Sequence, residues 1–240
     1  MISQLKRASL FAFGAPLAVV GLVVLGGCGG GGGDNDSRAR FVNGIYGTTS
    51  TLSVNGTAFN LNGTTATTFS TATFYTPIPT AADTFSLSVT SFPSITPSVS
   101  ETPASSTRYT MFAFGRTDVS TTDPRYPVLN WVTDDRTVPG TGNTRLRVIN
   151  GAPDLGAIDV YRNGSKFVSS LGYDALQGYA EFGGGNYTLT VTPAGSTTPA
   201  TTTSVPLSTG DLYTLVVLEA NPTSATPTYT TLVINDSAAG

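Results

Sequence analysis

Apolar and polar residues alternate along several short segments of the chain. Phe85–Val89 and Tyr187–Val191 each place apolar side chains at every second position and hydroxyl side chains between them. This period of two is typical of a β-strand with one packed face and one hydrated face. Leu212–Leu218 is a more continuous apolar run, which predicts a central strand covered on both sides.

The strand-like segments occur twice, in the same order and about a hundred residues apart. Arg40–Gly44 reads Arg-Phe-Val-Asn-Gly, and Arg147–Gly151 reads Arg-Val-Ile-Asn-Gly. The other matched pairs are Leu52–Gly56 with Ile158–Gly164, Thr84–Thr90 with Asn186–Thr192, Ser106–Phe114 with Thr209–Val217, and Val128–Asp135 with Tyr229–Asp236. A repeated unit of this length is a domain, so the pattern predicts two tandem domains rather than a solenoid.

Turn signals define the expected fold of each unit. Asn55-Gly56 and Asn163-Gly164 lie between strand-like runs and predict tight hairpins, because Asn and Gly accept a positive φ. Short strands with frequent turns predict an antiparallel β-sandwich of the immunoglobulin-like kind, with the strand topology left open. We expect domains at residues 38–137 and 145–240, joined by a Pro- and Gly-containing linker at 138–144.

The first 27 residues have the plan of a secretory signal peptide. Lys6 and Arg7 precede an apolar run from Ser9 to Val24, and small residues follow before Cys28. A membrane-spanning helix is the alternative, but it needs about 20 apolar residues, and this shorter run contains glycine and proline. We therefore expect export and cleavage after Gly27.

Cys28 is the single cysteine of the chain, and Gly29–Gly33 follow it directly. The stretch Leu25–Cys28 resembles the lipobox of bacterial lipoproteins, which implies acylation of the Cys28 thiol and a palmitate-type membrane anchor. Gly29 is not an aspartate, and the resemblance then implies sorting to the outer membrane where a cell has one. Residues 28–37 have no apolar periodicity and predict a flexible tether.

Composition limits the chemistry that the chain can perform. It contains no histidine, which removes the commonest general base and the commonest metal ligand. The net charge is −3, and no long basic segment is present, so no nucleic-acid partner is expected. Asp134-Asp135 and Asn235-Asp236 supply too few oxygens for calcium, and we expect turns there. We expect no metal, no cofactor and no catalytic residue.

Two sets of side chains are candidates for function. Trp131, Phe74, Tyr75 and Tyr126 would serve as an aromatic platform for a saccharide, although aromatic residues of a β-sandwich more often belong to its core. Tyr75 and Tyr126 lie near prolines in expected loops, which makes them the pair to test. The carboxylates of the second unit, Asp154, Asp159, Asp174 and Glu181, have spacings that a glycosidase pair could use, but turns and polar strand faces explain them as well.

Arg147–Tyr161 reads Arg-Val-Ile-Asn-Gly-Ala-Pro-Asp-Leu-Gly-Ala-Ile-Asp-Val-Tyr. This segment resembles the opening signature of a bacterial and archaeal lipoprotein domain, the domain of unknown function forty-three ninety-seven. Gly185–Leu189 and Leu232–Asp236 resemble later strands of that family. The first unit is similar but departs at the signature, with Ile45–Thr48 in place of Ala-Pro-Asp-Leu. The resemblance implies extracytoplasmic β-domains and carries no known activity.

Together these features predict a non-catalytic, lipid-anchored envelope protein that acts as an interaction, adhesion or structural display module. Its expected partners are the membrane, through the acyl chains on Cys28, and either an envelope polysaccharide or another surface protein. A carbohydrate-binding accessory module is the alternative. A hydrolase that uses Asp154 and Asp159 is a third hypothesis, and it predicts that activity is lost when either residue becomes Asn.

Overall fold

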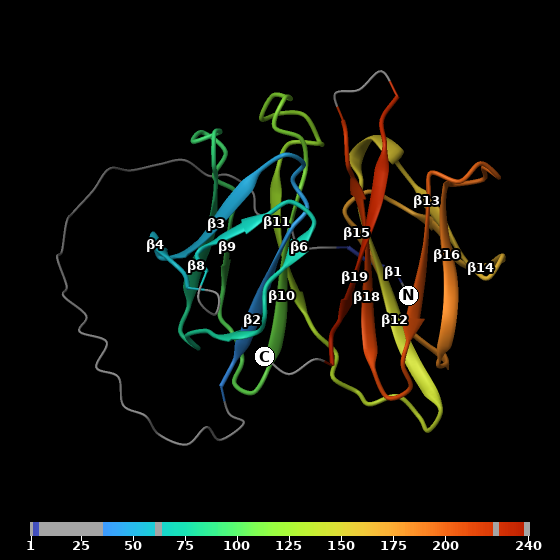
Figure 1. Ribbon diagram of the computed structural model, residues 1–240. Helices are drawn as coiled ribbons and strands as arrows, with labels where there is room; N and C mark the ends of the chain where they lie inside the picture. Colours follow the sequence, from blue (N-terminus) through green and yellow to red (C-terminus); the bar gives the residue numbers. More distant parts are fainter. Residues whose placement is uncertain (1, 5–35, 61–63, 223–225, 238–240) are drawn as a thin grey trace, which may run out of the picture.

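The computed structural model describes residues 2–4, 36–60, 64–222 and 226–237. The described residues form two β-sandwiches in tandem, which confirms the predicted fold class (Figure 1). The strands of the first domain are β2 (Arg38–Asn43), β3 (Thr49–Val54), β4 (Thr57–Ala58), β5 (Ala66–Thr68), β6 (Thr71–Ala72), β7 (Thr76–Pro77), β8 (Asp83–Val89), β9 (Ser98–Glu101), β10 (Arg108–Phe114) and β11 (Val128–Thr133).

The second domain repeats this plan. Its elements are β12 (Asn143–Gly151), the short 3-10 helix η1 (Pro153–Leu155), β13 (Ile158–Arg162), β14 (Ser165–Leu171), β15 (Ala175–Gly183), β16 (Gly185–Pro193), β17 (Thr201–Leu207), β18 (Leu212–Glu219) and β19 (Tyr229–Asn235). Strand β12 begins inside the predicted 138–144 linker, because a turn from Gly140 to Asn143 starts its pairing with β15 at once.

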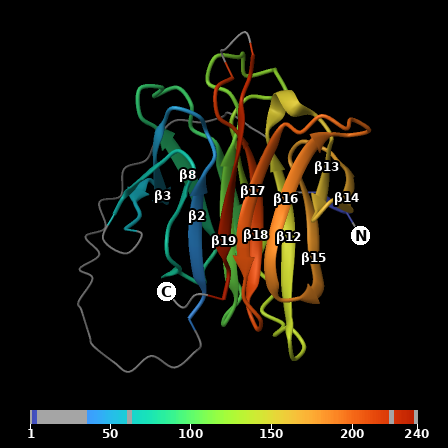
Figure 2. The same ribbon diagram turned by 45° about the vertical axis from the view of Figure 1, so that its right-hand side comes forward.

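The two domains share one sheet topology. The inner sheets have the orders β11-β10-β2-β6 and β19-β18-β12-β15, and β7 also pairs with β2. The outer sheets have the orders β4-β3-β8-β9 and β14-β13-β16-β17, and the four sheets stack as layers in Figure 2. All pairs are antiparallel except β2 with β10 and β12 with β18, which run parallel.

The strand registers correct the sequence alignment of the two repeats. Arg40 lies opposite Thr110, and Arg147 lies opposite Thr214, so these pairs occupy the same place in the two domains. Extending the registers to β11 and β19 makes Asp134 the counterpart of Asp236. Matching Asp135 with Asp236 was therefore wrong by one residue, which in a strand reverses the face of the side chain.

The inner sheets pack against each other and are buried on both faces. Along β10, Tyr109, Met111 and Ala113 belong to the first domain's core, whereas Phe112 and Phe114 belong to an apolar cluster shared with the second domain. Strand β18 alternates in the same way, and every residue of it is buried between β12 and β19. The prediction of a central strand at Leu212–Leu218 is confirmed.

Two glycines permit this close packing. A Cβ atom on Gly151 would lie 2.4 Å from Cδ1 of Phe114, and a Cβ on Gly44 would lie 2.7 Å from Cδ2 of Leu218. Each glycine therefore faces a side chain of the other domain. The glycine that ends each signature segment thus leaves room for a side chain of the other domain to pack against the backbone.

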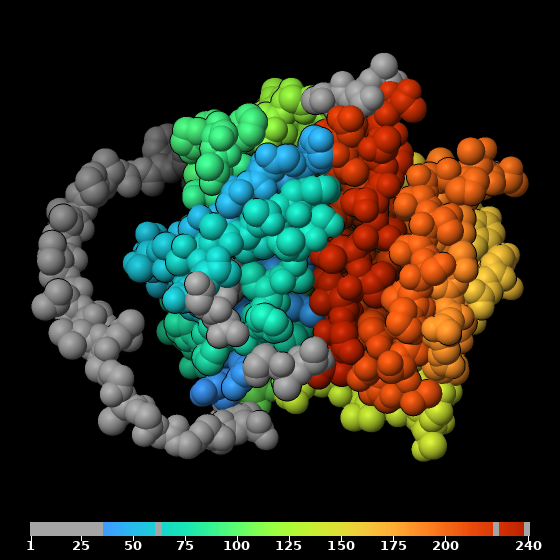
Figure 3. Space-filling model, in the orientation of Figure 1, coloured from blue at the N-terminus to red at the C-terminus, as the bar shows by residue number. Residues whose placement is uncertain are grey.

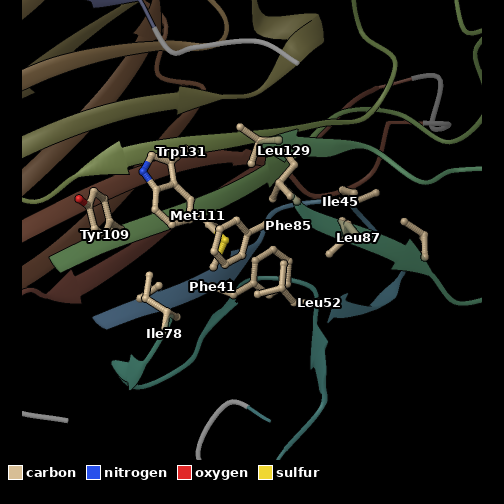
Figure 4. Close-up of a cluster of buried hydrophobic side chains, with 14 of the residues drawn as sticks. Phe41, Ile45, Leu52, Ile78, Phe85, Leu87, Tyr109, Met111, Leu129 and Trp131 are labelled. Carbon is tan, nitrogen blue, oxygen red and sulfur yellow. The ribbon is translucent and has the colours of Figure 1, made fainter. Parts of the chain in front are cut away.

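The first domain's own core contains Trp131, which packs its ring against Phe85 and Tyr109 at centroid distances of 4.7 and 4.6 Å (Figure 4). Asn55 and Asn163 both have positive φ, at 49° and 47°, directly before glycines that also have positive φ. Both predicted hairpins are therefore confirmed, between β3 and β4 and between β13 and β14.

A further strand, β1 (Ile2–Gln4), lies within the predicted signal peptide and pairs antiparallel with the outer edge of β15. The predicted cleavage after Gly27 would remove β1 and leave that edge of β15 uncovered. The rest of the predicted signal, Cys28 and the tether up to residue 35 lie outside the described residues.

Candidate functional site

The most unusual feature of the described residues is a cluster of four charged side chains buried between the domains. Arg40 of β2 binds Asp236 of the second domain, and Arg147 of β12 binds Asp134 of the first at 2.5 Å. All four side chains are only 2 or 3% exposed. Each arginine pairs with the aspartate of the other domain, so the two ion pairs are related to each other by an approximate twofold axis between the domains. We call these four residues the ionic quartet.

Hydroxyl groups complete the hydrogen bonding of the quartet in the same twofold pattern. Thr110 accepts from Nε of Arg40 and donates to Asp134, and Thr214 accepts from Arg147 and donates to Asp236. Tyr75 also donates to Asp134 at 2.8 Å, and its counterpart Tyr179 donates to Asp236 at 2.6 Å. Each aspartate therefore accepts hydrogen bonds from one threonine and one tyrosine hydroxyl of its own domain, in addition to the guanidinium of the other domain.

Electrostatics keeps the quartet charged despite its burial. Burial alone would raise the pKa of Asp134, but the guanidiniums of Arg147 and Arg40 outweigh that effect, and the pKa lies below its usual value. Burial next to Asp134 raises the pKa of Tyr75, so this phenol stays protonated and donates. The guanidinium carbon of Arg40 lies 4.7 Å from the centre of the Tyr75 ring. Asp134 therefore stays ionised and Tyr75 stays protonated near neutral pH.

A second charged cluster lies at the opposite end of the domain interface. Arg116 and Arg125, from the loop between β10 and β11, both contact the carboxylate of Asp154 in η1, and Arg125 does so at 2.8 Å. Each arginine also binds an aspartate of its own loop, Asp118 or Asp123. Asp154 is thus held by two guanidiniums of the other domain.

Glu219, the last residue of β18, lies beside Asp154 and is 3% exposed. Its burial and the Asp154 carboxylate next to it raise the pKa of Glu219 to about 7, and Arg116 opposes this shift. The pKa of this carboxyl group therefore falls close to neutral pH.

A groove of about 410 Å³ follows one side of the interface, where the segment Ser70–Tyr75 meets Leu232–Asn235 of β19. Figure 3 shows this side, on which the cyan residues of the first domain meet the red C-terminal strand. Phe74 lines the groove and is 62% exposed. Strands β6 and β19 are both edge strands of their sheets, so the groove runs between two sheet edges.

The structure does not gather the predicted aromatic residues into an exposed platform. Trp131 and Tyr75 are 8% and 4% exposed, the first in the core and the second bound to the quartet. Tyr126 is half-buried against the same core. Tyr75 does lie in a loop, directly before β7, but the pairing of β7 with β2 holds its ring beneath Arg40 and Arg108 and buries it.

The predicted acidic residues are each held by separate partners. Asp159 is buried and accepts from Lys166 and from the backbone N–H groups of Ser170 and Gly195. Asp174 accepts from Asn130 of the first domain at 2.7 Å. Glu181 accepts from Gly140 and Asn143 in the turn before β12. Asp159 does not lie on a hydrated strand face as expected, because the β13–β14 hairpin and the loop after β16 cover it.

Within the described ranges, no three acidic, cysteine or histidine side chains cluster in a way that could hold a metal ion. In the same part of the chain there is no helix of sufficient length and apolarity to span a bilayer. Cys28 and Gly27 lie outside the described residues, so their predicted roles stay predictions.

The fold and the repeated signature agree with the comparison to known families. The family model described as Domain of unknown function (DUF4397) matches residues 37–161 and 145–240. The chain therefore belongs to this family, with two copies of the domain in tandem. A comparison with curated proteins finds no match to the chain.

The sequence contains a repeated pattern of charges that points to the quartet, although no recognised motif includes it. Arg40 and Arg147 stand at the same place in both repeats, each between two apolar neighbours, and an aspartate directly follows the last strand of each repeat. Charged residues are almost never fully buried unless paired. A charge kept at both copies of an apolar strand therefore predicts a buried ion pair.

We predict that Asp134→Asn destabilises the protein by about 3 to 5 kcal/mol, because it removes the carboxylate that Arg147 contacts at 2.5 Å and leaves two buried guanidiniums with one aspartate. The neighbouring Asp135→Asn is the matched control. Asp135 is 44% exposed and pairs with Arg145 near the surface, so we expect a loss of less than about 1 kcal/mol. Urea unfolding at neutral pH measures both. Similar losses for the two variants would contradict a buried quartet.

We also predict that Glu219 makes the protein less stable as the pH rises from about 4.5 to about 7. The unfolded chain loses this proton near the usual pKa of 4.5, whereas the folded chain keeps it until about 7. The folded state therefore binds more protons in this window, and the free energy of unfolding falls by about 3 kcal/mol across it. Glu219→Gln should remove this slope in urea titrations at several pH values, and an unchanged slope would exclude Glu219 as its source.

Proposed function

We propose that this protein is a non-catalytic, lipid-anchored module of the bacterial cell envelope that presents two β-domains as one rigid body. The observation that supports rigidity is the ionic quartet together with the apolar cluster shared by the inner sheets. Domains joined only by a linker would rotate freely, whereas a buried, exchanged set of ion pairs fixes one orientation. Such a body suits interaction, adhesion or structural display at a surface.

The anchoring part of the proposal is supported by the sequence. Leu25–Cys28 resembles a lipobox, and Cys28 is followed by a glycine tether. One acyl chain binds a membrane only marginally, and two or three chains on a single residue give stable attachment. The mature chain would have 10 basic and 15 acidic residues once Lys6 and Arg7 are removed. Its contact with the membrane would then depend on lipid rather than on charge.

We expect Cys28→Ser to move the protein from the membrane fraction to the soluble fraction of bacterial cells that express the full chain. The wild-type protein should show the added mass of acyl chains by intact-mass measurement, on a polypeptide that begins at Cys28. Ser37→Ala, beyond the lipobox, serves as the control and should stay with the membrane. Finding unmodified Cys28 in the wild-type membrane fraction would overturn the anchor.

Carbohydrate binding is the second candidate, and the groove between β6 and β19 favours it. Saccharides bind to exposed aromatic rings, and Phe74 presents such a ring at the groove, unlike the buried Trp131. Catalysis by Asp154 and Asp159 has less support, because both carboxylates are already held by cationic partners.

A screen of envelope glycans against the mature chain would test the second candidate. Saturable binding should fall at least tenfold in Phe74→Ala if the groove is the site. Phe92→Ala is the matched control, since Phe92 is 36% exposed and lies outside the groove. Equal loss in both variants, or no binding to any glycan, would count against a saccharide site and favour a protein partner or a spacer.

A further inference from the structure

The interface between the domains contains contacts that obey the twofold relation and contacts that break it. The ionic quartet obeys it, since each domain supplies one arginine and one aspartate in equivalent positions. A second copy of either domain could make the same exchanged pairs. The quartet therefore fixes how two domains dock but does not determine which two domains dock.

The cluster at the other end of the interface breaks the relation. The first domain supplies Arg116 and Arg125, and the second supplies Asp154 and Glu219. The registers of the parallel strand pairs place Gly115 of the first domain where the second has Glu219. In the sequence, Gly47 stands at the place of Asp154, and the loop at residues 220–228 contains no basic residue. The cations of this cluster thus come from the first domain, which also supplies Asp118 and Asp123, whereas the second domain supplies carboxylates alone.

A contact on the flank of the interface has the same asymmetry. Asp174 of the second domain is 2% exposed and accepts from the amide of Asn130 in β11. The register of β19 on β18 places Leu232 where β11 has Asn130. A second copy of the second domain would therefore present an apolar side chain to Asp174 in place of the amide.

We infer that the inner face of the second domain is a selective docking surface that accepts the first domain of this chain and rejects a second copy of itself. Facing its own copy, it would bury Asp154, Glu219 and Asp174 without the two guanidiniums and the amide that the first domain supplies. Burying carboxylates after the loss of guanidiniums and an amide donor that face them is costly, so mispairing is disfavoured. The first domain's arginines keep Asp118 and Asp123 in any pairing, so the selectivity resides in the second domain.

The test uses the mature chain with a protease site inserted after Val138, which is 75% exposed between the domains. After cleavage, the two halves are unfolded in urea, refolded together and weighed as complexes by native mass spectrometry. We expect the mixed pair to exceed the pair of two second domains by at least tenfold. Random pairing would give a twofold excess and would overturn the inference, as would halves that separate as monomers.

Removing the charges should relax the selectivity. In the cleavable chain with Asp154→Asn and Glu219→Gln, we expect the pair of two second domains to increase severalfold. Asp118→Asn is the matched control, because Asp118 binds the same Arg116 from within the first domain and should leave the distribution unchanged. An unchanged distribution in the double variant would overturn the role of the carboxylates.

The uncleaved chain provides a second measurement that does not require the halves to refold. Urea unfolding of Arg116→Ala, Asp154→Asn and the double variant forms a thermodynamic cycle. We expect the double variant to lose less stability than the two single losses combined, since each single variant removes the same contact. Strict additivity would mean that the two residues do not recognise each other, and the inference would fail.

Discussion

The arrangement of the whole molecule depends on four charges buried where two sheets meet. Arg40 and Asp134 belong to the first domain and Arg147 and Asp236 to the second, and the two shortest ion pairs each join one domain to the other. Buried ion pairs add little net stability, because the cost of removing charges from water offsets their attraction. Their effect is on geometry, since a shift of the domains by one strand position would break both of these pairs and leave only the longer Arg147–Asp236 contact within the second domain. The quartet therefore determines the relative position in which the two sheets dock.

Docking of the two domains also explains individual residues of the repeated signature segment. Its arginine enters the quartet, and its glycine lets a side chain of the other domain approach within contact distance. Its asparagine, Asn43 or Asn150, accepts from the backbone two residues on and donates to a backbone carbonyl of a later strand, at Thr67 in β5 or Leu171 in β14. Each signature segment thus determines both the turn that follows its strand and how closely the other domain packs against it.

The sequence predicted the strands, the hairpins and the repeat, because these depend on periodicity and on local backbone preference. It indicated a strand covered on both sides only at Leu212–Leu218, and it did not reveal that the second covering layer is the other domain, since that layer comes from residues up to 196 positions away. Tyr75 illustrates the difference: it lies in a loop near a proline, yet its ring is buried because β7, directly after it, pairs with β2. Asp154 and Asp174 likewise looked like free turn residues until the first domain supplied their partners.

The direction in which the strands run shows at which end of the domain interface the proposed anchor joins the fold. The segment from Cys28 enters the fold at Arg38, the start of β2, which is the end of the interface that holds the quartet. Strands β10 and β18 run from that end towards Phe114 and Glu219, so Arg116, Arg125 and Asp154 gather at the opposite end. Under the proposed anchor, the symmetric contacts would lie near the membrane and the asymmetric ones far from it. The distal end is then where the two domains differ most in charge, and where a partner would distinguish one from the other.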